Sequence, residues 1–178
     1  MLQMNRFRVW VLSLAGLLAG TTCKGGDGVK VDTSTVRQLD VARFMGKWYE
    51  IARYEHRFER GMTHVTAEYT LLPDGKIRVV NRGLKDGKPK EIVGKARRPN
   101  PEEYPGRLEV SFFLWFYSDY YILELAPDYQ YAVIGGSTDK YLWILARQEK
   151  ISSPVREKIL SGLKKRGYDI SRLVYVEQ

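Results

Sequence analysis

The sequence predicts an all-β domain, either an antiparallel barrel or a sandwich, followed by a single helix. Short runs of apolar and aromatic residues recur between residues 47 and 147, and clusters of Gly, Pro, Asp and Asn separate them. Such even spacing of short strands and turns is typical of antiparallel β structure. Aromatic residues make up 12% of the chain, including 12 Tyr, and they favour strands over helices. After Pro154 the apolar spacing becomes helical.

Eight strands are expected, over residues 47–54, 64–72, 76–84, 90–97, 107–113, 120–125, 131–136 and 141–147. The segments between them suit turns. In Pro73-Asp74-Gly75, for example, Pro presets one dihedral angle and Gly accepts a positive φ. A one-turn helix capped by Asp40 is expected just before the first strand.

The predicted C-terminal helix covers residues 154–166, with Ser153 as its N-cap and Pro154 at its first helical position. Gly167 is expected to end it. Residues 173–176 are expected to form a last short strand that pairs on the edge of the sheet. The apolar residues of the helix fall on one stripe, which must be buried against the outside of the sheet: Val155, Ile159, Leu160 and Leu163.

The first 22 residues are predicted to be an export signal. Arg6 and Arg8 precede an apolar run over residues 9–19, which is too short to span a bilayer. Cys23 is the only Cys of the chain, and residues 23–38 begin with a Gly-rich stretch that suits a flexible tether. This arrangement resembles a bacterial lipoprotein signal, which implies acylation of Cys23 and a membrane anchor. Thr is uncommon directly before such a Cys, so cleavage by the ordinary signal peptidase is the alternative.

A Gly-x-Trp pattern opens the first predicted strand, at Gly46 and Trp48. By alternation, Trp48 shares one face with Glu50, Ala52 and Tyr54. A Trp at the start of an inward face can plug one end of a small closed sheet. An ordinary buried edge strand would explain the pattern equally well, because Gly-x-Trp alone is a weak signal.

Three segments in this order resemble the conserved regions of the lipocalins: residues 46–53 (GKWYEIAR), 127–131 (PDYQY) and 142–147 (LWILAR). Several other segments look like the branch of that family that contains the bacterial outer-membrane lipocalins and apolipoprotein D. The resemblance covers residues 41–176, and it departs at Pro127, where the family usually has Thr. It implies an eight-stranded antiparallel up-and-down β-barrel over residues 39–178, with the C-terminal helix packed outside.

The same resemblance implies a function. It points to fatty acids, lysophospholipids or similar lipids, so the expected ligand is a small hydrophobic molecule in the barrel. The implied roles are lipid storage, lipid transport or maintenance of the envelope. The implied location is the outer membrane of a bacterium, on its periplasmic side. The alternative is a structural or partner-binding barrel without a lipid cargo, whose interior is filled by its own side chains.

The predicted strands assign side chains to the closed end and to the wall of the barrel. At the closed end the Arg147 guanidinium is expected to stack on the Trp48 ring and to stabilise the fold, with Gly46, Asp128 and Tyr129 nearby. The pocket wall is expected to be mostly aromatic and aliphatic, as ligand pockets usually are. Its predicted members are Ala52, Tyr54, Tyr69, Val79, Asn81, Val110, Phe112, Tyr120, Ile122, Tyr141 and Trp143.

The open end is expected to carry aromatic side chains. Phe58 lies in one mouth loop, and Trp115, Phe116 and Tyr117 lie in another, predicted over residues 114–118. Neighbouring residues alternate in direction, so at least one of these three rings should be exposed. An exposed aromatic cluster of this kind either touches the lipid source or forms a homodimer contact.

Two carboxylates are predicted on the inner face of the barrel, Glu50 and Glu124. A buried carboxylate must be paired or protonated. The two could anchor a polar headgroup or an amine of the ligand. Alternatively, they pair internally with a Tyr, Asn81 or an Arg, or a slip in the alternation leaves one of them exposed.

Composition disfavours other classes of protein. The net charge is +8, but the basic residues alternate with apolar ones along the strands, which argues against nucleic-acid binding and suits an anionic membrane surface. A single Cys allows no internal disulfide, and His56 and His64 are interpreted as solvated loop residues, so no metal site and no cofactor are expected. Nothing near Ser137 could activate it as a nucleophile, and the protein is not expected to be an enzyme.

Overall fold

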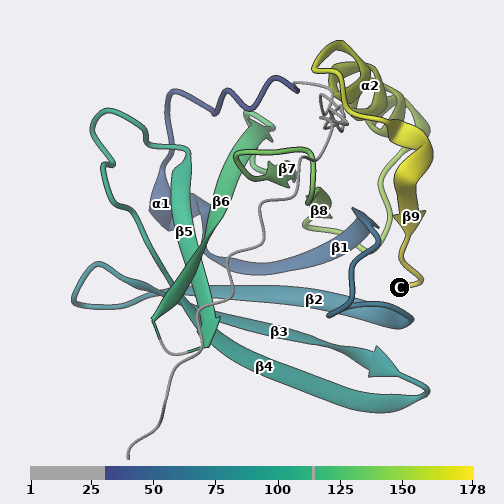
Figure 1. The fold of residues 1–178 in the computed structure, drawn as a ribbon, viewed down its shortest axis with the longest axis horizontal. Coiled ribbons are helices and arrows are strands. Elements are labelled where there is room, and N and C mark those ends of the chain that lie inside the picture. Colours follow the sequence, from purple (N-terminus) through teal and green to yellow (C-terminus); the bar gives the residue numbers. More distant parts are fainter. Residues whose placement is uncertain (1–30, 114) are drawn as a thin grey trace, which may run out of the picture.

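Antiparallel strands pair in chain order and close on themselves in the computed structural model, which describes residues 31–113 and 115–178 (Figure 1). Strand β1 pairs with β8 on one side and with β2 on the other, and the second pairing closes the barrel. The predicted eight-stranded barrel with a helix outside it is confirmed. Its strands are β1 (Gly46–Tyr54), β2 (Met62–Leu71), β3 (Ile77–Lys85), β4 (Lys88–Arg97), β5 (Arg107–Phe113), β6 (Phe116–Leu125), β7 (Tyr131–Gly135) and β8 (Trp143–Ala146).

The start of β6 differs most from the prediction. This strand begins at Phe116 instead of Tyr120, because Phe113 and Phe116 pair across a tight hairpin. The aromatic loop predicted over residues 114–118 is therefore wrong in its extent. Phe116 and Tyr117 are strand residues, and strand alternation sets their directions.

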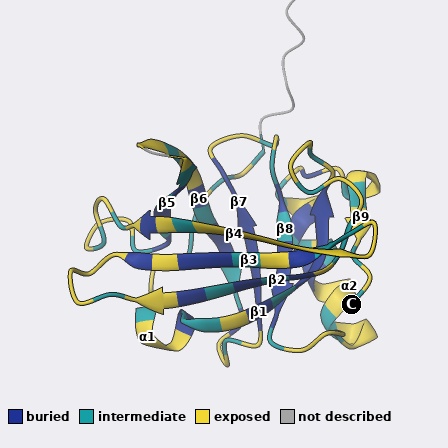
Figure 2. Cartoon of the chain, turned by 90° about the horizontal axis from the view of Figure 1, so that it is seen from below, coloured by how far each residue is buried: buried dark blue, intermediate teal, exposed yellow. Residues whose placement is uncertain are grey.

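Two β-bulges change which residues face the interior. A bulge adds one residue to one strand and so reverses the alternation beyond it. In β1 the register against β8 shifts between Glu50 and Ala52, and in β6 the register against β7 shifts between Ile122 and Glu124. Buried and exposed residues alternate along only part of the sheet: Figure 2 shows them in turn along β3, whereas β7 is buried along its whole length.

Helix α2 (Ser153–Lys165) covers one outer face of the barrel. Its buried residues Ile159 and Leu163 belong to one apolar cluster with outward-facing side chains of β1, β6, β7 and β8. The N-cap is Ser152, so the prediction of Ser153 as the cap is wrong by one residue. Neither this helix nor any other in the described part of the chain is long and apolar enough to cross a bilayer.

The segment before the barrel is docked rather than free. The Asp32 amide donates to the Arg166 carbonyl (2.8 Å), and the Val36 amide donates to the Ile122 carbonyl (3.0 Å). Val36 also packs against the interior cluster. The described part of the predicted tether, residues 31–38, thus lies against the barrel, whereas Cys23 and the predicted signal fall outside the described residues.

The C-terminal segment fills a gap between β1 and β2. The β1–β2 pairing ends at Tyr49 and Thr66, and beyond that point β9 (Leu173–Tyr175) pairs with β1 instead. A short 3-10 helix, η1 (Ile170–Arg172), leads into β9. Past β9, the Gln178 side-chain amide donates to the carbonyls of Glu50 (2.6 Å) and Val65 (3.0 Å). The tail therefore bridges the two strands where they part.

The barrel wall is also loosely joined between β4 and β5. These strands pair only where Lys95–Arg97 meet Glu109–Ser111, while β4 pairs with β3 along its whole length. The ring of Phe112 crosses close to Gly94, where an added Cβ would lie 2.6 Å from a ring carbon. Glycine at this position allows the close crossing.

The closed end is built around Trp48 and Arg147, the stacked pair predicted from the sequence. Trp48 is fully buried, its indole N–H donates to the Phe44 carbonyl (2.9 Å), and the Arg147 guanidinium lies 3.8 Å from the centre of its ring. Arg147 also donates to the carbonyls of Lys47 (2.8 Å) and Met45 (2.8 Å). One side chain thus satisfies carbonyls at the end of helix α1 (Val41–Phe44) and at the start of β1.

The other predicted closed-end residues have local roles. Gly46 has φ +90, a left-handed conformation that favours glycine. The Tyr129 hydroxyl accepts from the amide of Asp40, which caps α1, and the Arg43 guanidinium lies 4.1 Å from the centre of the Tyr129 ring. The Asp128 carboxylate accepts from the Gln130 amide (3.2 Å) within the β6–β7 turn.

Arg147→Ala should lower the free energy of unfolding by about 1–3 kcal/mol, because several carbonyls lose a charged donor and the Trp48 face is uncovered. The free energy of unfolding of Arg147→Lys should lie between those of the wild type and Arg147→Ala, since Lys keeps the charge but lacks the planar guanidinium. Urea unfolding measures the effect. Normal unfolding together with lost ligand binding would contradict a structural role.

Candidate functional site

The half of the interior next to the closed end is filled by the protein's own side chains. The hydroxyls of Tyr69 and Tyr120 lie 2.8 Å apart, and burial raises the pKa of both. Phe44 and Trp48 pack beneath them in the same cluster. Seven predicted wall residues belong to or pack against this interior cluster: Tyr69, Val79, Val110, Phe112, Tyr120, Ile122 and Trp143.

Two predicted wall residues face the other way. Ala52 and Tyr54 belong to the cluster beneath α2, so their predicted inward orientation is wrong. The physical reason is the β1 bulge, which reverses the alternation after Glu50. The Tyr54 hydroxyl donates instead to the Asp169 carbonyl (2.8 Å), beside η1.

The predicted inward position of Glu124 is also wrong. The β6 bulge turns its side chain toward α2, where the Tyr131 hydroxyl donates to its carboxylate (2.7 Å). An added Cβ on Gly162 of α2 would lie 3.1 Å from the other carboxylate oxygen. Glu124 therefore belongs to the joint between the helix and the barrel and does not line the interior.

Asn81 supplies a polar atom on the apolar wall. It pairs with Ala67 of β2 and with Ile92 of β4. Its amide oxygen is buried and has no hydrogen-bond partner among the described residues. A ligand hydroxyl or amide could donate to this oxygen, since a buried acceptor without a partner costs free energy.

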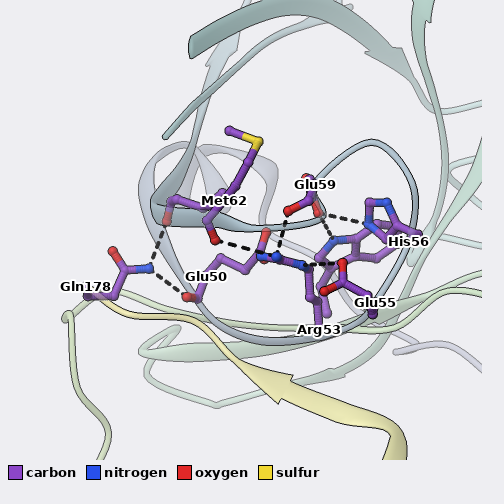
Figure 3. A network of polar contacts seen from close by, with 9 residues as sticks. Glu50, Arg53, Glu55, His56, Glu59, Met62 and Gln178 are labelled. Carbon is purple, nitrogen blue, oxygen red and sulfur yellow. Dashed lines mark hydrogen bonds and ion pairs between the residues drawn. The ribbon is translucent and has the colours of Figure 1, made fainter. Parts of the chain in front are cut away.

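The open half of the interior holds a buried charged group that the alternation did not predict. Arg53 is 2% exposed and donates to the Glu50 carboxylate (2.8 Å) and to the Glu59 carbonyl (2.7 Å) (Figure 3). The signal for a bulge in β1 was absent from the sequence pattern. Only the strand register brings Arg53 to the same face as Glu50.

Glu59 comes from the loop over residues 55–61 and lies within this group. Its Oε2 atom is 3.0 Å from the Trp143 indole nitrogen and 2.8 Å from His56 Nε2. Burial opposes ionisation of Glu59, but the contacts with His56 and Trp143 outweigh it and hold the pKa of this carboxyl below its usual value. The interpretation of His56 as a solvated residue is wrong, because its ring packs edge-on against Tyr141 and Trp143.

The mouth of the barrel is rimmed by exposed aromatic side chains. Phe58, Trp115 and Phe116 are each at least 70% exposed, as predicted, and Phe113 joins them. Tyr117 was also predicted at the mouth, but it is not part of this rim, because the Arg97 guanidinium stacks 4.1 Å from the centre of its ring on the outer face. Tyr141 stacks on Trp143, with ring centres 5.8 Å apart.

Two hollows of the surface have volumes of about 390 Å³ and about 200 Å³. The larger is lined by residues of β2, β3 and β4, including the ion-paired Arg82 and Glu91. The smaller lies beside the closed-end loop that contains Pro99 and Tyr104. Neither is lined by the aromatic wall and mouth residues, so neither corresponds to the predicted pocket.

The buried Glu50 carboxyl should make stability depend on pH. Burial, together with the nearby Glu59 carboxylate, raises the pKa of Glu50 to about 8 in the folded protein, against 4.5 for an unperturbed Glu. Between these values the folded state binds a proton that the unfolded state lacks, so stability should fall as pH rises from about 4.5 to about 8. Glu50→Gln should remove this slope in urea unfolding followed across pH. If the pH dependence of stability is unchanged in Glu50→Gln, a group other than Glu50 causes it.

Comparisons with known proteins agree with the fold. The model of the lipocalin-like domain matches residues 39–178. The chain is 39% identical over 165 residues to the outer membrane lipoprotein Blc of Vibrio cholerae, covering 91% of this chain and 96% of that protein. It is 32% identical to mouse apolipoprotein D, covering 96% and 94% of the two chains.

The fold also matches solved structures. Insecticyanin from the tobacco hornworm Manduca sexta superposes with a TM-score of 0.69 at 22% identity, covering 85% of this chain and 87% of that one. The predicted location in the outer membrane agrees with the names of the bacterial relatives. The family model, the identity to full-length relatives and the barrel itself lead to one conclusion: the chain belongs to the lipocalin-like family.

Proposed function

We propose that this protein is an envelope lipocalin that binds a single-chain lipid, a fatty acid or a lysophospholipid, in the open half of its barrel. The observation that carries the proposal is the division of the interior. An apolar wall that includes Val110 and Phe112 of β5 lines the interior, and a buried polar group around Arg53 of β1 lies in its open half. The acyl chain lies along the wall, and the headgroup lies near the polar group.

Family membership supports the coarser part of this function, the binding of a small hydrophobic ligand. Lipocalins generally bind ligands without catalysis, and we assign no reaction to this chain. The names of the bacterial relatives support an outer-membrane location, in which lipid storage, lipid transport or envelope maintenance would be the role. Asn81 suits a ligand that carries a hydroxyl, as the glycerol of a lysophospholipid does.

The mouth supports collection of the lipid from a membrane. Phe58, Trp115 and Phe116 are exposed there, and aromatic rings suit the interface between headgroups and acyl chains. Exposed Arg57 and Arg60 flank Phe58, and their charge would attract anionic lipids. The same aromatic surface could instead form a homodimer, which cross-linking in solution would detect.

A second candidate is a structural or partner-binding barrel without cargo. It is favoured by the filled interior near the closed end, where Trp48, Tyr69 and Tyr120 pack together, and by the exposed mouth aromatics. The two candidates differ in a simple respect. Only the lipid-binding protein should lose its function when the open half of the interior is blocked.

Val110→Trp tests the interior as the lipid site. The larger ring should fill the wall beside Phe112 and weaken displacement of a fluorescent acyl probe by palmitate at least tenfold. Val93→Trp is the matched control, because Val93 is 46% exposed on β4. Circular dichroism and urea unfolding verify that both variants fold. If folded Val110→Trp binds palmitate like the control, the interior is not the site and the second candidate is preferred.

Cys23→Ser tests the membrane anchor. Acylation of Cys23 would add about 0.8 kcal/mol of membrane affinity per buried methylene, enough to hold a water-exposed barrel on a bilayer when more than one chain is attached. The variant should move to the aqueous fraction after cell lysis, and mass spectrometry of the wild-type mature N-terminus should find the acylated Cys. A variant that remains in the membrane fraction would contradict the anchor.

A further inference from the structure

We infer that Glu59 is a built-in competitor for the ligand: its carboxylate occupies the position that the anionic headgroup of a bound lipid takes. The inference rests on the proposed function and names the residues that select the headgroup. It predicts that removal of Glu59 strengthens the binding of lipids with a carboxylate or phosphate and leaves the binding of neutral lipids of the same chain length unchanged.

The first support is the geometry at the Glu59 carboxylate. A single oxygen, Oε2, lies 3.0 Å from the indole nitrogen of Trp143 and 2.8 Å from Nε2 of His56. The His56 and Glu59 side chains are only 10% and 15% exposed. The Trp143 indole N–H donates to this oxygen and the His56 ring lies close to it, in a largely dry position that strengthens polar contacts with an anion.

The second support is the charge behind these donors. Arg53, buried on the same side, donates to the main-chain carbonyl of Glu59 and to the carboxylate of Glu50 (Figure 3). Its contact with Glu55 is long, 3.9 Å. The headgroup position is therefore backed by a guanidinium that stays charged in proteins. Burial and the nearness of Glu59 keep Glu50 largely protonated at neutral pH, so Glu50 offsets little of that charge.

The third support is that the Glu59 side chain can leave without breaking the loop. Turn hydrogen bonds join the Glu59 amide to the His56 carbonyl (3.3 Å) and the Met62 amide to the Glu59 carbonyl (2.9 Å). Both involve the main chain only. Rotation of the Glu59 side chain toward solvent would free the Trp143 indole N–H and the space beside the His56 ring while the loop stays in place.

This exchange explains the expected selectivity. A ligand carboxylate or phosphate replaces the Glu59 carboxylate, so the Trp143 N–H keeps an anionic acceptor and the His56 ring keeps an anionic neighbour. A neutral alcohol offers a weaker acceptor and cannot displace Glu59 as well. It should bind along the wall with Glu59 still in place, and its affinity should not depend on Glu59.

The test compares palmitate with hexadecanol, using displacement of a neutral fluorescent acyl probe at pH 7.5. Glu59→Ala should bind palmitate about tenfold more tightly than the wild type, because the competitor is gone, while hexadecanol affinity stays within twofold. Glu102→Ala, which removes an exposed carboxylate at the closed end, is the charge-matched control and should change neither affinity. Trp143→Phe keeps an aromatic ring but removes the indole donor, and it should weaken palmitate binding in the Glu59→Ala background.

Several outcomes would overturn the inference. Equal changes for palmitate and hexadecanol in Glu59→Ala would assign Glu59 a role in shaping the pocket. Weaker palmitate binding, or none of the expected gain in a variant that unfolds normally in urea, would show that Glu59 does not compete. If the wild type binds hexadecanol but Glu59→Ala shows no palmitate gain, the proposed function survives and only the inference is lost. If neither palmitate nor hexadecanol binds to the wild type or to Glu59→Ala, the proposed function and the inference are both contradicted.

Discussion

The β-bulge in β1 is the constraint on which both the interior and the outer face depend. Regular alternation would place Ala52 and Tyr54 inside the barrel and Arg53 outside. The extra residue after Glu50 reverses this, so Tyr54 joins the cluster beneath α2 and Arg53 enters the interior. One irregularity of the backbone therefore directs Tyr54 to the cluster beneath the outer helix and Arg53 to the polar group at the mouth.

Burying that polar group would be costly if its polar and charged atoms had no hydrogen-bond partners. Removal of a charge from water is offset only when good hydrogen bonds replace the lost hydration. Arg53 has Glu50 and a main-chain carbonyl as acceptors, and Glu59 accepts from Trp143 and lies 2.8 Å from His56 Nε2. The C-terminal Gln178 adds hydrogen bonds to main-chain carbonyls of β1 and β2 at the same height. The mouth is thus held by polar contacts, whereas the closed end is held by packing around Trp48.

The two ends of the barrel therefore have different roles. At the closed end, Trp48 is fully buried and Arg147 satisfies carbonyls from α1 and β1, which suits a region whose role is stability. At the open end, exposed Phe58 and Trp115 surround a polar group that belongs partly to a loop. Loops hold fewer buried contacts and open at lower free energy than strands, so exchange with a ligand belongs there.

Local sequence signals determined the number and order of the strands and the outer helix, because alternation, turn residues and a helical stripe are read within a few neighbours. The stacking of Arg147 on Trp48 followed from the sequence only on the assumption that the first and last barrel strands pair. Only the tertiary structure decided the directions of Ala52, Tyr54, Arg53 and Glu124. Bulges arise from the register between paired strands, and no run of residues within one strand records that register. The same holds for Glu59, whose loop meets Trp143 across 84 positions of the chain, a contact that exists only once the barrel has closed.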